Sequence, residues 1–220
     1  MSPRAINEDK KKDLKPWDVR PWPSVGDGDI EKLYAAVGRA LSMWERSEYG
    51  LSYLFSTFCG AGTPIQARPA QNAYNAIRTF EGRTEMLAAA SKTFFYGYGD
   101  LGTCCKRFKT IFSVAKALGP RRNEIAHGVV DAYISEPKTL RPQIIEAWAL
   151  YPGPVNFKGR TLEYQPNYCY TSVEIDHYVQ EFSKLRDPSI ELAMDIVTEV
   201  KKQSASLNKS LKRPSQRMDR

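Results

Sequence analysis

The longest periodic feature of the chain is an apolar stripe that begins just after Gly28 and continues for about eight helical turns. Its members recur at alternating intervals of four and three residues, which places them on one face of an α-helix: Ile30, Tyr34, Val37, Leu41, Trp44, Glu48, Leu51, Phe55 and Phe58. Such a stripe is stable in water only when other elements cover it. The chain is therefore predicted to be mainly α, an up-and-down helical bundle built around this helix.

Glu48 is the one charged member of the stripe. A buried carboxylate costs free energy unless it is paired or hydrogen-bonded, so Glu48 needs a partner or a task. In a structural interpretation, the side chain turns to a wet groove or is held by a core arginine. In a functional interpretation, Glu48 is an active-site acid, and we favour this second interpretation.

Helical periodicity recurs in three later segments. A loop over residues 60–69 leads to a second helix at about 69–95, and a third helix covers 101–118. A final helix begins at Thr171 or Ser172, because both residue types suit the N-cap position.

This final helix is expected to end near Gln203 and contains Pro188. Proline has no amide hydrogen and its ring clashes with the preceding turn, so we expect a kink or a break there. Residues 28–203 are then one helical domain.

The segment between the third helix and the last has a different composition. Residues 129–134, 144–150 and 162–171 are rich in Val, Ile, Tyr and Trp and are separated by Pro, Gly and Asn. This pattern is typical of short strands. We expect a small antiparallel sheet, so that residues 129–171 form a minor β insertion before the C-terminal helix.

Both ends of the chain differ from the middle. Residues 1–27 contain prolines at a density that excludes a helix, so we expect an extended arm whose Trp17 and Trp22 pack on the body. The net charge is +7, and residues 201–220 alone contribute +6. We expect residues 204–220 to form a basic disordered tail, which keeps the protein in solution or attracts RNA without sequence preference.

The composition also limits the setting of the protein. No run of about 18 apolar residues occurs, so no membrane association is expected. Four cysteines lack metal-type spacing and the chain has two histidines, His127 and His177, so neither a metal site nor another cofactor is expected. A reduced, cytoplasmic setting fits this composition.

The chemistry of the chain concentrates in one stretch after the third helix: Arg121-Arg122-Asn123-Glu124-Ile125-Ala126-His127-Gly128. Gly119-Pro120 is expected to break the preceding helix and to start a short one, which Gly128 ends in the left-handed conformation. Asn123 and His127 share a helix face, whereas Arg122 lies about 140° from His127 around the axis. Arginine matches phosphate geometry and histidine exchanges protons near neutral pH, and a nuclease needs both groups.

Arg122-Asn123, followed after three residues by His127 and Gly128, resembles the signature of the HEPN superfamily of small helical domains. The resemblance covers about residues 28–203. Many members of this family are metal-independent ribonucleases, frequently toxins or antiviral effectors, and they commonly act as dimers. Members often place an acidic residue near the arginine and histidine, which is the position that Glu48 would take.

The resemblance implies a metal-independent endoribonuclease that leaves 2′,3′-cyclic phosphate and 5′-hydroxyl ends. His127 would transfer protons, Arg122 would hold the phosphate, and Asn123 would orient His127 or a phosphate oxygen. One histidine leaves a monomer short of a second proton-transfer group, so a homodimer is expected. Expected partners are RNA, a second copy, and an antitoxin or other protein in a toxin–antitoxin or defence setting.

Other interpretations remain open. His127 would be favourable at a helix C-terminus through its charge alone, and Arg122 would brace the helices through an ion pair with Glu48. The chain would then be a non-catalytic HEPN-like module that binds a ligand, RNA or a protein partner. A further interpretation is an antitoxin-like or regulatory RNA-binding protein that uses the basic tail.

Overall fold

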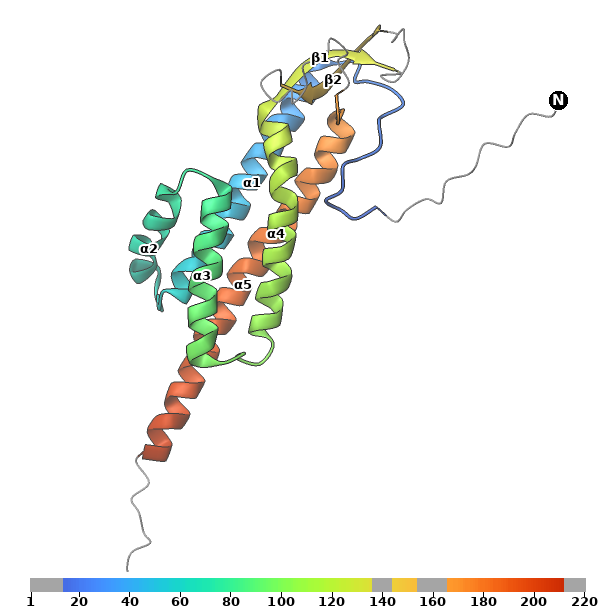
Figure 1. The fold of residues 1–220 in the computed structure, drawn as a ribbon. Helices are drawn as coiled ribbons and strands as arrows, with labels where there is room; N and C mark the ends of the chain where they lie inside the picture. Colours follow the sequence, from blue (N-terminus) through green and yellow to red (C-terminus); the bar gives the residue numbers. More distant parts are fainter. Residues whose placement is uncertain (1–13, 136–143, 154–165, 212–220) are drawn as a thin grey trace, which may run out of the picture.

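The computed structural model describes residues 14–135, 144–153 and 166–211 (Figure 1). Within these ranges lie five helices and two strands: α1 (Ile30–Phe58), α2 (Pro64–Ala76), α3 (Phe80–Tyr98), α4 (Cys104–His127), β1 (Gly128–Ile134), β2 (Ile144–Pro152) and α5 (Ser172–Leu211). The protein is mainly α with a small sheet before the C-terminal helix, which confirms the predicted fold class.

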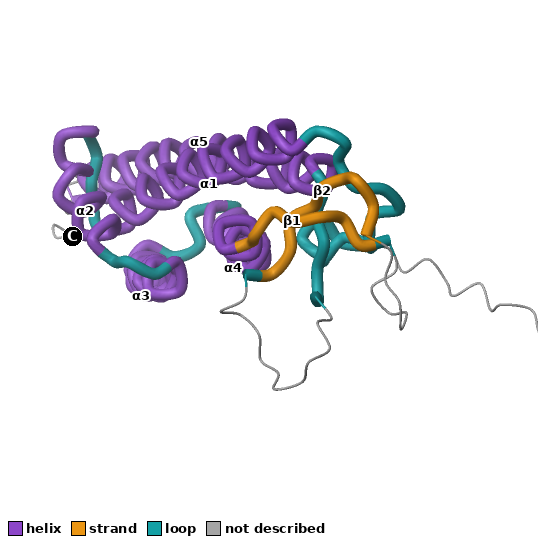
Figure 2. Tube along the Cα trace, turned by 90° about the horizontal axis from the view of Figure 1, so that it is seen from above, coloured by secondary structure: helices purple, strands orange, loops and turns teal. Residues whose placement is uncertain are grey.

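Successive helices alternate in direction and form two layers. Helices α1 and α5 lie side by side in one layer, with α3 and α4 against them and α2 at one end (Figures 1 and 2). Trp44 of α1 joins the layers, because its ring meets Phe80 of α3 at 4.9 Å and Phe182 of α5 at 5.0 Å, both edge-on. The sheet closes one end of the bundle, and the last turns of α5 extend beyond the other end.

The predicted stripe on α1 is fully buried only in its second half, and in the first half Val37 and Leu41 are partly buried against the main core. Trp44 and the later members are buried, but Tyr34 is 49% exposed and the buried positions before Trp44 are Leu33, Ala36 and Ala40. The alanines allow α5 to approach closely. Gly50 serves the same purpose, since a Cβ there would lie 2.9 Å from the Arg186 carbonyl oxygen.

The predicted second helix is two helices, and the predicted loop at 60–69 is largely helical. Helix α2 begins at Pro64 after the N-cap Thr63 and ends at Ala76, and a short non-helical turn precedes Phe80. Thr79 caps α3, because its hydroxyl oxygen accepts from the Gly82 amide at 3.2 Å. This turn places the first residues of α3 close to the middle of α1.

The predicted break at Gly119-Pro120 does not occur. Helix α4 continues through Pro120 to His127, with Pro120 exposed and Gly119 packed against the Phe80 ring. A Cβ at Gly119 would lie 2.7 Å from Phe80 Cε1. Gly128 has φ −73° and extended geometry, so it begins β1 rather than capping a helix in the left-handed conformation.

Helix α5 is longer than predicted and unbroken at Pro188. Close packing of Gly50 against Arg186 and Ser189 supports α5 at this point. The helix ends at Leu211 instead of near Gln203, so residues 204–211 are helical rather than a disordered tail. Residues 212–220 lie outside the described part of the chain.

Strands β1 and β2 pair antiparallel, with Gly128 opposite Pro152 and an irregularity after Ala132. The two strands predicted at 129–134 and 144–150 are confirmed. Of the third, predicted at 162–171, residues 162–165 lie outside the described part of the chain. Residues 166–171 do not form the predicted strand, and only Tyr170 pairs, in an isolated bridge with Leu150.

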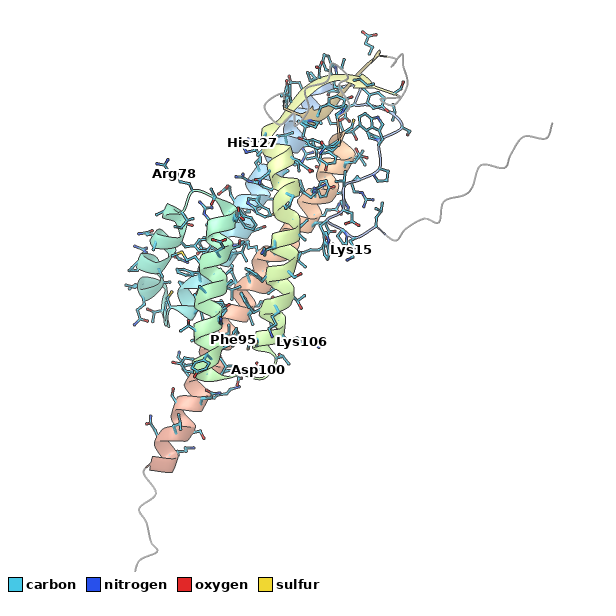
Figure 3. All side chains as sticks on the ribbon, viewed as in Figure 1. Lys15, Arg78, Phe95, Asp100, Lys106 and His127 are labelled. Atoms are coloured by element: carbon cyan, nitrogen blue, oxygen red, sulfur yellow. The ribbon has the colours of Figure 1, made fainter. Side chains whose placement is uncertain are left out.

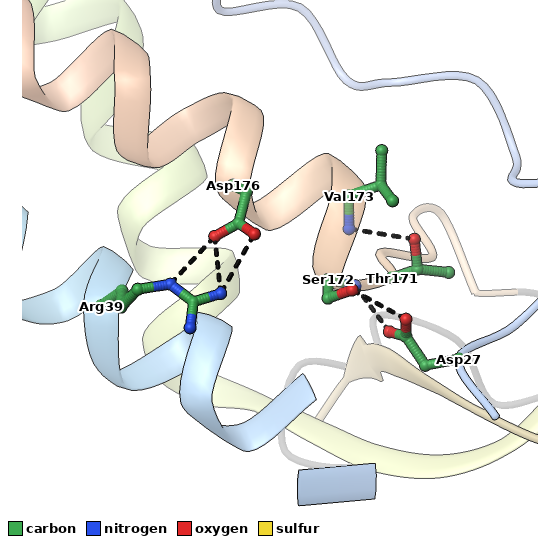
Figure 4. A network of polar contacts seen from close by, with 6 residues as sticks. All are labelled: Asp27, Arg39, Thr171, Ser172, Val173 and Asp176. Carbon is green, nitrogen blue, oxygen red and sulfur yellow. Dashed lines mark hydrogen bonds and ion pairs between the residues drawn. The ribbon is translucent and has the colours of Figure 1, made fainter. Parts of the chain in front are cut away.

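The described part of the N-terminal arm is bound to the body, and both tryptophans pack on it as predicted. Trp17 packs on the main core, and Trp22 Nε1 donates to the Ile134 carbonyl at 3.0 Å. The buried Asp27 carboxylate caps α5, because it accepts from the Ser172 amide at 2.6 Å and the Ser172 hydroxyl at 2.7 Å (Figure 4). The arm therefore fixes the end of the molecule where α4 meets the sheet.

Candidate functional site

The polar stretch predicted to carry the chemistry forms the last turns of α4. Ile125, which is 1% exposed, anchors these turns in the core. The side chains around it point in different directions. Arg121 and Glu124 face the segment that leads into α5, whereas Arg122 faces α1.

The Arg121 side of the helix is a compact hydrogen-bonded network. Arg121 Nη2 lies 2.8 Å from Glu124 Oε1, and Arg121 Nη1 donates to the Tyr170 hydroxyl at 3.3 Å. Tyr170 donates in turn to Glu124 Oε2 at 2.5 Å, and the Tyr168 hydroxyl donates to the Glu124 carbonyl. Burial raises the pKa of the Glu124 carboxyl, and the bonds from Tyr170 and Arg121 oppose this rise. The network joins α4 to the start of α5.

Arg122 is held much more loosely than Arg121. Its Nη1 donates to Asn123 Oδ1 at 3.2 Å, and its Nη2 lies 3.9 Å from Glu45 Oε1. Its side chain is 28% exposed, compared with 12% for Arg121. The Nε atom of each arginine is buried without a hydrogen-bond acceptor among the described residues, so the difference lies in the terminal nitrogens.

Glu48 is buried as the stripe predicted, and an arginine holds it, but this arginine is Arg83 of α3. Arg83 Nη1 lies 2.6 Å from Glu48 Oε2. Burial raises the pKa of the Glu48 carboxyl, and the Arg83 charge and hydrogen bond oppose this rise. The positive charge of Arg122 also acts on Glu48, but no hydrogen bond or ion pair joins the two described side chains. The sequence does not identify Arg83, because its partner lies 35 positions away on another helix.

His127 ends α4 at the edge of the sheet (Figure 3). Its side chain is exposed and makes no hydrogen bond or ion pair with the described residues. The structure therefore brings Arg122 and Asn123 into contact and places Glu48 within electrostatic range of Arg122. No hydrogen bond or ion pair of the described residues joins the His127 side chain to any of the three, and the catalytic roles of all four residues stay predictions.

No second site is found among the other titratable groups that the structure describes. His177 Nε2 lies 2.9 Å from the Pro16 carbonyl oxygen, so it helps to fix the arm. Among the described residues, no group of three or more His, Cys, Asp or Glu side chains is placed to hold a metal ion. None of the described helices combines the length and apolar character that a membrane span requires.

Comparison of the chain with protein-family models, curated proteins and solved structures gives no significant match. The resemblance to HEPN domains rests on the order and spacing of Arg122, Asn123 and His127 alone.

Proposed function

We propose that the protein is a metal-independent endoribonuclease of HEPN type, with Arg122 as the phosphate-binding group and His127 as the proton-transfer group. The observation that supports this most is the loose engagement of Arg122. Its guanidinium is partly exposed, and its contact with Glu45 is 3.9 Å long. A partly exposed guanidinium with weak contacts can direct two N–H donors to a phosphate, because few existing hydrogen bonds are lost.

In this proposal, the 2′-hydroxyl of the RNA attacks the adjacent phosphorus and expels the 5′-oxygen of the next nucleotide. The products are a 2′,3′-cyclic phosphate and a 5′-hydroxyl end. His127 transfers a proton, and Arg122 stabilises the charge that develops on the phosphate oxygens. Asn123 Oδ1 accepts from Arg122, so the role assigned to Asn123 is to orient that guanidinium.

The reaction needs a base and an acid, and one exposed histidine supplies only one of them at a time. We infer a homodimer whose two-fold axis brings the α4 ends of both copies to a single RNA strand. Analytical ultracentrifugation at micromolar concentration is expected to show a dimer. A strictly monomeric protein that still cleaves RNA would contradict the composite site.

A non-catalytic HEPN-like module is the second candidate, and one observation favours it. Glu48 is already bound by Arg83, and no hydrogen bond or ion pair of the described residues joins His127 to Arg122, so the polar groups of the signature are not linked in one copy. Such a module would bind RNA, a ligand or a protein partner such as an antitoxin. For either candidate, the toxin or defence role and the cytoplasmic setting follow from the sequence resemblance and composition.

Cleavage of mixed single-stranded and transfer RNA in the presence of chelator separates the two candidates. The proposal expects cleavage with cyclic phosphate ends, and it expects His127→Ala and Arg122→Ala to abolish it while folding persists. His177→Ala and Arg107→Ala are the matched controls, because they remove a histidine on α5 and an arginine from the opposite end of α4. Activity that vanishes with chelator, or that survives His127→Ala, would leave the binding module as the function.

A further inference from the structure

Two arginines from different helices lie around one buried carboxylate. Glu48 is 5% exposed, Arg83 bonds it directly, and Arg122 is the second cation whose charge acts on it. Glu45, one turn earlier on α1, adds a negative charge to the same region. Arg122 therefore lies in the field of a carboxylate that another arginine already occupies.

Arg83 is fixed in its position by more than Glu48. Its Nε donates to the Ile77 carbonyl at 2.8 Å, and its Nη2 donates to the Asn75 carbonyl at 3.4 Å. Both carbonyls belong to the end of α2 and the turn before α3. The guanidinium also lies 6.0 Å from the ring centroid of the buried Tyr74. These contacts hold the guanidinium beside Glu48 through the α2–α3 connection.

A buried carboxylate that loses its partner is costly, so it takes the nearest cation that can reach it. Without Arg83, that cation is Arg122, because its Nη2 lies 3.9 Å from Oε1 of Glu45, one turn from Glu48 on α1, and its charge acts on Glu48. Arg122 has few bonds to lose, because its contacts to Asn123 and Glu45 measure 3.2 and 3.9 Å.

We propose that Arg83 is a positioning residue for Arg122: by occupying Glu48, it leaves the Arg122 guanidinium available to a phosphate. The identity of the anion as the phosphate of an RNA rests on the proposed function. The competition itself rests on the contacts around Glu48. A merely structural Arg83 would also affect stability when replaced, but it would not make the Arg122 affinity depend on the charge of Glu48.

The test is titration of the protein with inorganic phosphate, followed by the ¹⁵N NMR signal of Arg122 Nε. The buried position of this atom slows its proton exchange, which makes the signal observable. Arg83→Gln is expected to weaken phosphate binding at Arg122 by about fivefold or more, the lower end of typical coupling between sites. Adding Glu48→Gln to Arg83→Gln is expected to restore most of the lost affinity, because the competing charge is gone.

Two further variants sharpen the test. Arg83→Lys keeps the positive charge but not the bidentate guanidinium. The affinity of Arg122 for phosphate in this variant is expected to lie between those of wild type and Arg83→Gln. Arg107→Gln removes an arginine that pairs with Asp195 and is the matched control, with phosphate binding at Arg122 expected to match wild type. If Arg83→Gln does not fold, Arg83→Lys decides: weaker phosphate binding at Arg122 than in wild type supports the competition, and binding equal to wild type contradicts it.

The proposal is overturned if phosphate leaves the Arg122 signal unchanged, if Arg83→Gln binds like wild type, or if the double variant remains as weak as Arg83→Gln. The same preparations are assayed for RNA cleavage. If wild type cleaves RNA but the double variant does not recover phosphate affinity, the role of Arg83 is refuted and the ribonuclease proposal stands. If the double variant recovers phosphate affinity but wild type does not cleave RNA, the role of Arg83 stands and the ribonuclease proposal is refuted.

Discussion

Arg121 and Arg122 are neighbours in sequence, but their surroundings differ in almost every respect. Arg121 joins a half-buried network with Glu124 and Tyr170, and its contact with Glu124 is 2.8 Å long. Arg122 makes one hydrogen bond to the adjacent Asn123 and a distant contact to Glu45. Two arginines on one helix are thus used differently, because the helical period turns one to the start of α5 and the other to α1.

Under the proposed function, this difference separates a structural role of Arg121 from a phosphate-binding role of Arg122. Arg121 is occupied by partners that it cannot leave without exposing a buried carboxylate, so its contribution is to the free energy of unfolding. Arg122 has donors that a ligand could take. Variants on the two sides of α4 test this contrast.

The largest effect is expected for His127, on the Arg122 side. His127→Ala is expected to lower the cleavage rate by about 10²–10⁴-fold, the usual contribution of a proton-transfer group. Its side chain has no bonds to other described residues, so the melting temperature is expected to stay near that of wild type. Single-turnover cleavage measures the rate, and thermal unfolding measures the melting temperature. A loss of activity that is explained by unfolding would contradict the assignment.

On the Arg121 side, the expected effect is on stability. Tyr170→Phe removes the hydroxyl that donates to Glu124 Oε2, and it is expected to lower the free energy of unfolding by about 1–3 kcal/mol. Cleavage by the folded fraction should change little. Tyr34→Phe is the control, because Tyr34 is half exposed. Urea unfolding of both variants gives the comparison, and equal stability would show that the network is not structural.

The same network predicts a pH dependence. Burial raises the pKa of Glu124 above its ordinary value near 4.5, so the folded state binds this proton more tightly than the unfolded state. The contribution of Glu124 to stability is therefore fully present below about pH 4.5 and is lost as the pH rises through the folded pKa. Relative to Glu124→Gln, wild type is expected to gain stability on acidification from neutral pH. Urea titrations across this range would contradict the account if the difference falls instead.

The smallest effect on stability is expected at the far end of α5. Deleting residues 204–220 is expected to shift the melting temperature by less than about 2 °C, because residues 204–209 are exposed. The deletion removes most of the excess positive charge, so the salt dependence of RNA binding is expected to flatten. An equal salt slope in both proteins would place the binding surface within the nearly neutral bundle.

The sequence predicted those parts of the fold that depend on local pattern. It predicted the fold class, both described strands and the burial of Glu48. It failed where small residues carry the packing, because Ala36 and Ala40 do not stand out in an apolar stripe. It also failed at Pro120, where the predicted break is absent. At Pro188, where a kink or a break was predicted, α5 is unbroken.

The site was less predictable for a related reason. Arg83 and Tyr170 reach Glu48 and Glu124 across 35 and 46 positions, and no periodicity connects them. The pairing of Arg121 with Glu124 is a local contact of spacing three, which the sequence does contain.

The most direct test of the contrast is a paired measurement on Arg121→Gln and Arg122→Gln. The account predicts that Arg122→Gln loses about 10²-fold or more in cleavage, the typical cost of removing a transition-state donor, with a melting temperature near that of wild type. It predicts that Arg121→Gln unfolds at a clearly lower temperature and cleaves at a similar rate while folded. If both variants lose stability and activity in the same proportion, or if Arg122→Gln cleaves RNA like wild type, the division of roles is wrong.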